Sequence, residues 1–184
     1  MSPGADATRG QPIEVGVDYS LGYLLVNEGK QPAMLERVRV LGVTGPIEVI
    51  GVLAAPHPGT RGSMISLFGF PPEEYPARPL SEEHVVPVPT SFGEAGSPDQ
   101  GLQLEVGVRA TGAGVGRVRG IEVVYKVGDR RYRIVNPGGG VLCAPASAYV
   151  GRRGKDDDCG GPATDPHFDN KFVDFRALAI APGA

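Results

Sequence analysis

Apolar and polar residues alternate along several short stretches of the chain, and a period of two is typical of β-strands. The clearest stretch is 102–109, where four aliphatic side chains alternate with Gln103, Glu105, Gly107 and Arg109. We expect a strand with one face on a core and one face in solvent. Strands of this kind favour antiparallel sheets.

A β-hairpin is predicted over residues 120–136, around the two-residue loop Gly128-Asp129. Glycine tolerates the positive φ angles that tight hairpin turns require. The expected cross-strand pairs are Val127 with Arg130, Lys126 with Arg131, Tyr125 with Tyr132, and Val123 with Ile134. Aromatic and branched pairs then share one face. The other face sets Lys126 opposite Arg131, a mild like-charge penalty.

Further strands are expected where apolar runs lie between turn residues. They are 13–19, 23–26, 35–43, 47–53, 64–69, 84–88, 140–143 and 172–180. The glycine-rich stretches 112–116 and 137–140 are interpreted as turns, because no amphipathic helix follows either one to complete a phosphate-binding loop. Many short strands without a helical period predict an all-β, immunoglobulin-like sandwich of antiparallel sheets.

The domain organisation follows from these patterns. We expect a flexible leader over 1–11, a single β-sandwich domain over 12–180 and a short tail over 181–184. Residues 54–98 hold nine of the 18 prolines and are predicted to be a Pro-rich insertion of loop or edge structure. Shortening this insertion is expected to spare most of the fold and to damage partner binding.

The two cysteines, Cys143 and Cys159, lie in Gly- and Asp-rich sequence and do not form a CxxC pair. We expect a disulfide that closes a C-terminal loop over 143–170 and implies an oxidising compartment. The alternative is two unrelated buried thiols.

Charge and composition narrow the possible partners. The net charge of −3 gives no general reason to bind nucleic acid or anionic lipid. No apolar run is long enough for a membrane span, and no signal peptide is present. We hypothesise that Met1 is an expression start and that a signal sequence or anchor precedes this segment in the natural protein. The excess of Arg over Lys, 14 to 4, is typical of GC-rich genomes and suggests an actinobacterial source.

Two segments resemble a known class of protein. Residues 26–33, followed by the alternating stretch 35–40, resemble bacterial immunoglobulin-like modules of secreted and surface proteins. Residues 120–133 with Leu142-Cys143 resemble the terminal strands of uncharacterised actinobacterial lipoproteins or single-pass ectodomains. The resemblance implies a fold and an extracytoplasmic location, secreted or anchored, and supplies no catalytic residues.

Candidate chemistry is sparse. The acidic residues Asp156, Asp157, Asp158, Asp165 and Asp169 could supply oxygen ligands to calcium, although their spacing does not match an EF-hand loop. A weaker candidate for zinc or copper combines scattered side chains, which are His57, His84, His167, Met34 and Met64. No Gly-x-Ser-x-Gly nucleophile motif is present.

We therefore expect a non-enzymatic binding or interaction module of the cell envelope, without a cofactor, whose partner is a protein or an envelope component. The alternatives are a calcium-dependent structural or adhesion module, and a hydrolase with an unrecognised carboxylate site. Two basic groups could contribute to a surface for an acidic partner if the fold brought them together. They are Arg130, Arg131 and Arg133, and Arg152 and Arg153.

Overall fold

The protein is all-β, as the alternation predicts. The computed structural model describes residues 10–25, 27, 30–56, 66–72, 78–80, 84–85, 102–148, 159 and 178–179. The strands are β1 (Gln11–Pro12), β2 (Asp18–Leu25), β3 (Ala33–Leu41), β4 (Ile47–Pro56), β5 (Ser66–Phe68), β6 (Arg78–Pro79), β7 (His84–Val85), β8 (Leu102–Ala110), β9 (Gly114–Val118), β10 (Gly120–Val127), β11 (Arg130–Asn136), β12 (Gly140–Ala144) and β13 (Leu178–Ala179). The described residues contain no α-helix, and a 3-10 turn, η2 (Ala146–Ala148), follows β12.

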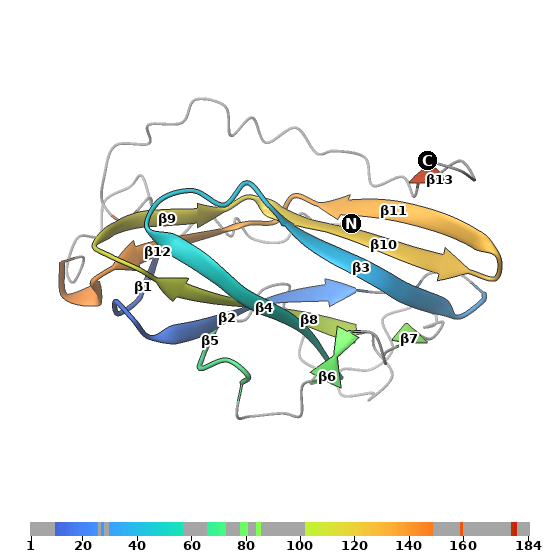
Figure 1. Cartoon of the computed structure of the whole chain (residues 1–184), viewed down its shortest axis with the longest axis horizontal. Coiled ribbons are helices and arrows are strands. Elements are labelled where there is room, and N and C mark those ends of the chain that lie inside the picture. Colours follow the sequence, from blue (N-terminus) through green and yellow to red (C-terminus); the bar gives the residue numbers. More distant parts are fainter. Residues whose placement is uncertain are drawn as a thin grey trace, which may run out of the picture.

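These strands form three sheets arranged as a sandwich (Figure 1). The β8 sheet has the order β5-β2-β8-β4-β6, and the β10 sheet has the order β13-β11-β10-β3-β7. The small β12 sheet has the order β1-β12-β9. Since β9 leads into β10 and β11 leads into β12, one long hairpin runs through the β12 and β10 sheets. All described strand pairs are antiparallel except β1 with β12, which is parallel.

The predicted hairpin is confirmed at every pair. Val127 lies opposite Arg130, Tyr125 opposite Tyr132, and Val123 opposite Ile134. The Tyr125 and Tyr132 rings stack with centroids 5.4 Å apart, and Gly128 at the turn has a φ of 56°. Turn chemistry and cross-strand pairing therefore select the same register.

The core lies between the β8 sheet and the layer made of the β10 and β12 sheets. It combines aliphatic and tyrosine side chains from both layers. Its fully buried members with the largest side chains include Ile13, Leu21, Tyr23, Leu104, Val106, Val108, Val118, Ile121, Val123 and Leu142. The inward-facing members of each strand alternate, as the period of two requires.

The prediction that β8 has one solvated face is wrong. Gln103 is 2% exposed and Glu105 is 0% exposed, although both point away from the core. β8 is the central strand of its sheet, and its outer face is also covered. Part of the cover is Phe70, whose ring lies so close to Gly107 that a Cβ atom there would be 2.6 Å from the ring carbons.

Two other strand assignments differ from the prediction. The strands expected at 13–19 and 23–26 are replaced by one strand, β2, which pairs with β8 from Asp18 to Leu25, and residues 13–17 precede it outside any strand. The stretch 112–116, interpreted as a turn, contains the start of β9, which pairs with β12. Gly116 serves close packing here, because a Cβ atom on it would collide with the Ile47 side chain.

Parts of the Pro-rich segment 54–98 belong to the sheets. β4 extends to Pro56, and Ala54 is fully buried in the core. β5 adds an edge strand to β2, while β6 and β7 pair with β4 and β3. The described part of this segment is therefore structural as well as connecting.

Candidate functional site

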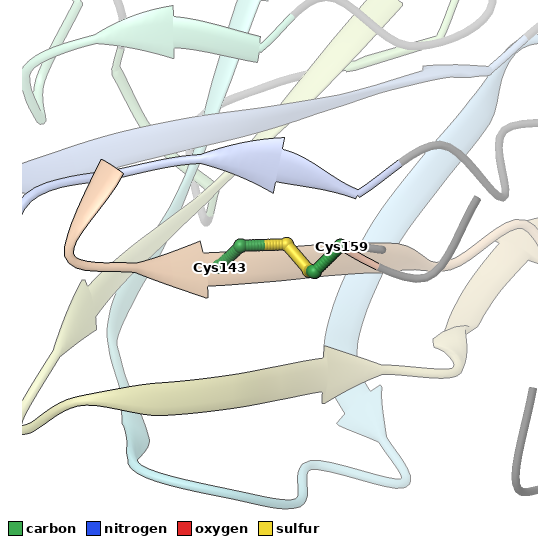
Figure 2. Close-up of a disulfide and its surroundings, with 2 residues drawn as sticks. All are labelled: Cys143 and Cys159. Atoms are coloured by element: carbon green, nitrogen blue, oxygen red, sulfur yellow. A yellow bond between two sulfur atoms is a disulfide. The ribbon is translucent and has the colours of Figure 1, made fainter. Parts of the chain in front are cut away.

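The predicted disulfide is present between Cys143 of β12 and Cys159 (Figure 2). The two Cα atoms are 5.9 Å apart, within the range that a disulfide allows, and the sequence separation is 16 residues. Cys143 is 0% exposed and Cys159 is 9% exposed. A buried disulfide of this kind is consistent with an oxidising environment.

The disulfide is packed into the β12 sheet. Its sulfur atoms and Val141 form a small apolar cluster, against which Val115 of β9 packs. On the β1 side, Gly10 lies so close that a Cβ atom on it would be 2.7 Å from both sulfur atoms. The disulfide thus joins the C-terminal loop to the region where the first described residues pair with β12.

The sequence-predicted metal ligands lie outside the described residues, namely Asp156, Asp157, Asp158, Asp165 and Asp169, and so do His57, His167, Met64, Arg152 and Arg153. His84 is on β7 and its backbone pairs with Met34 of β3. Within the described ranges, no group of three or more His, Cys, Asp or Glu side chains is placed to hold a metal ion. No helix in the same ranges is long and apolar enough to span a membrane.

The most distinctive surface of the described residues is the outer face of β3, β10 and β11. Alternation sends one set of side chains into the core and the other set outward, and half of the outward set is cationic. We define the arginine face as Arg37, Arg39, Lys126, Arg131 and Arg133. These five cations share the face with the carboxylates Glu36 and Glu122, which leaves an excess of three positive charges on a chain whose net charge is −3.

Glu36 bridges the like-charge pair that the hairpin register creates, and it offsets one of the two positive charges. The register of β3 shifts between Val124 and Tyr125 of its partner, so that Glu36 is an extra residue in a β-bulge. Its carboxylate accepts hydrogen bonds from Arg131 Nε at 2.6 Å and Nη2 at 3.2 Å, and lies 2.7 Å from Lys126 Nζ. The Arg131 guanidinium, followed by Lys126, holds the pKa of Glu36 below its ordinary value.

Arg37 and Arg39 are the cations of this face that no carboxylate of the described residues pairs with. Both are exposed, and they are separated by one residue on β3. Glu122 lies opposite Arg39 in the register, but its ion pair is with Arg133 at 3.5 Å. Arg37 and Arg39 are not among the basic groups predicted from the sequence, although their i, i+2 spacing on a predicted strand indicates a shared face.

A second charged cluster lies where the three inner strands of the β8 sheet, β2, β8 and β4, meet at their ends. Arg109 binds Asp18 through two parallel contacts, Nε to Oδ1 at 2.5 Å and Nη2 to Oδ2 at 3.0 Å, and reaches Glu48 at 3.4 Å. The hydrogen bond from Arg109 lowers the pKa of Asp18. Because this arginine is already paired on both sides, the cluster joins β2, β8 and β4 and displays no free cation.

Comparison of the chain with protein-family models, with curated proteins and with solved structures finds no match.

Proposed function

We propose that this chain is a non-enzymatic binding module that works outside the cytoplasm, secreted or tethered in the cell envelope, with a protein or an envelope component as its partner. The immunoglobulin-like family belongs to the same proposal and is suggested by residues 26–33 with 35–40 and by 120–133 with Leu142-Cys143. An actinobacterial origin belongs to it too, and the excess of Arg over Lys also suggests it. The buried disulfide supports the compartment, because such bonds persist where thiols are oxidised.

The observation that carries the binding role is the arginine face. It presents five cationic side chains on three paired strands, whose other face is fixed by the core. Lys126, Arg131 and Arg133 keep between 43% and 49% of their side-chain surface in solvent, whereas Glu122 and Val124 beneath them are buried. A partner would therefore meet the cationic side chains first. Charged groups held on a rigid scaffold can select a partner of complementary charge.

The test places a photo-cross-linking residue at Met34, a corner of this face that is 40% exposed, in the tagged chain in its source cells. The matched control is Val17, which is 41% exposed and precedes β2 in the other layer. We expect a discrete cross-link to an envelope component from Met34 and none from Val17. We also expect the tag to be cleaved by protease added to intact cells. A protected tag with two free thiols, or equal cross-linking from both positions, would contradict the proposal.

A further inference from the structure

The outward side chains of the arginine face form three rows across the strands. The rows are Arg39, Glu122 and Val135; Arg37, Val124 and Arg133; and Met34, Lys126 and Arg131. In the third row, Lys126 and Arg131 both pair with Glu36. In the second row, Arg133 pairs with Glu122. The two arginines without a carboxylate partner among the described residues, Arg37 and Arg39, therefore lie together on β3.

The ion pairs within this molecule indicate which kind of anion would bind Arg37 and Arg39. Arg109 with Asp18 and Arg131 with Glu36 are both two-point contacts between a guanidinium and a carboxylate. This fork geometry is the strongest and most directional form of arginine pairing. Arg37 and Arg39 carry the same fork, exposed and without a carboxylate among the described residues.

The spacing of the two arginines restricts the shape of the ligand. Residues two positions apart on a strand lie about 7 Å apart on the same face. An extended peptide with acidic residues at alternate positions repeats its carboxylates at this distance. The exposed corners Met34 (40%) and Val135 (37%) add apolar contact area, which suits a polypeptide better than a uniformly charged polymer.

We propose that the arginine face binds an extended acidic segment of a partner protein, with carboxylates at alternate residues paired to Arg37 and Arg39. This inference rests on the proposed binding function and adds the chemical class of the partner. Arg131 and Lys126 are held in place by Glu36 and extend the positive field along the face.

The experiment measures binding of the whole chain to a peptide of alternating glutamate and threonine, by fluorescence anisotropy at low ionic strength. A peptide of the same composition with glutamates in blocks of two keeps the charge and removes the repeat. We expect the alternating peptide to bind the wild type more tightly than the block peptide. Binding should weaken as salt is added, because exposed ion pairs are screened.

The deciding variant is Arg37→Gln/Arg39→Gln, and its matched control is Lys30→Gln/Arg130→Gln, which removes the same charge from exposed positions off the face. Two exposed arginine–carboxylate pairs together correspond to about a tenfold change in affinity. We expect that loss in the deciding variant, and less than about a twofold change in the control. Arg37→Lys/Arg39→Lys should fall between the wild type and the deciding variant, since it keeps the charge and removes the fork.

Three results would overturn the inference: no peptide binding by the wild type, equal affinity of wild type and Arg37→Gln/Arg39→Gln, or tighter binding of an oligothymidine or of polyphosphate than of the alternating peptide. Unchanged melting temperatures of both double variants are expected and separate loss of binding from loss of fold. A cross-link from Met34 in cells without peptide binding in solution would contradict this inference and leave the proposed function standing.

Discussion

At the scale of single residues, the two core tyrosines of β2 differ in the hydrogen bonding of their hydroxyl groups. Tyr19 is 3% exposed, and its hydroxyl oxygen accepts a hydrogen bond from the Glu14 backbone N–H at 3.0 Å. Tyr23 is 1% exposed, and its hydroxyl has no hydrogen-bond partner among the described residues. Burial raises the pKa of Tyr23 to about 12. A buried hydroxyl without a partner costs about 1–3 kcal/mol of desolvation.

We therefore expect Tyr23→Phe to stabilise the protein by about 1 kcal/mol near neutral pH, because it removes the unpaired group and keeps the ring. The control, Tyr19→Phe, should destabilise by a similar amount, because it leaves the Glu14 N–H without its acceptor. Denaturant unfolding of both variants measures the difference. Equal destabilisation by the two substitutions would contradict this account of Tyr23.

The same substitution has a pH signature. The pKa of Tyr23 is higher in the folded protein than its ordinary value of 10.0. Below pH 10 the hydroxyl is protonated in both the folded and the unfolded chain, and this group adds no pH dependence. As the pH rises from 10 toward about 12, the unfolded chain loses the proton first, and the wild type loses stability. For a pKa shift of this size, the free energy of unfolding should fall by on the order of 2 kcal/mol across this pH range. The stability gap between Tyr23→Phe and the wild type should widen over this window.

At the scale of elements, strands with the same clear alternation differ in whether their outward face is exposed to solvent. β10 is buried on both faces from Gly120 to Val124, whereas β11 has one half-buried face and one exposed face, as its pattern predicts. β8 has the same pattern but is buried on both faces, with Gln103 donating a hydrogen bond to Glu105 at 2.5 Å in the covered layer. Part of the cover is Phe70, from a distant part of the chain, which lies over the glycines of adjacent strands, Gly51 and Gly107.

The packing of Phe70 on these glycines can be measured by a double-mutant cycle. Gly107→Ala should destabilise by about 1–3 kcal/mol, because its Cβ atom would displace the Phe70 ring. In a Phe70→Ala background the same substitution should cost clearly less, a coupling of about 1 kcal/mol or more. Gly112→Ala is the control, since its nearest neighbour is Pro46 Cβ at 3.8 Å. Additive effects of Gly107→Ala and Phe70→Ala would disprove the contact.

At the scale of the whole molecule, the disulfide joins Cys143 to Cys159, 16 residues further along, at the end of the sandwich formed by β1, β9 and β12. It tethers Cys159 to the buried strand β12, beside Gly10 and the parallel pair of β1 with β12. A closed loop of this length restricts the unfolded chain more than the folded one. The bond therefore stabilises the fold chiefly by its effect on the unfolded state.

Removing the bond by Cys143→Ala/Cys159→Ala should lower the free energy of unfolding by about 3 kcal/mol, as a loop of this length implies. Chemical denaturation of the oxidised wild type, the reduced wild type and the variant measures the effect. The reduced wild type should match the variant, apart from the small packing difference of the thiols. An unchanged denaturation midpoint after reduction would show that the bond contributes no stability.

The sequence by itself determined the all-β class, the 120–136 hairpin with its register, and the cysteine pair. These depend on local information: a period of two, the φ preference of a glycine turn, and two cysteines in loop-forming sequence. It did not predict the second covered face of β8, the strand character of 114–118, or the joining of Arg37 and Arg39 to the hairpin arginines. Each of these depends on which strands become neighbours across long sequence separations, and on Phe70 and Ile47 packing against glycines. Tertiary pairing alone places Glu36 between Lys126 and Arg131, because its bulge exists only once β3 lies beside β10.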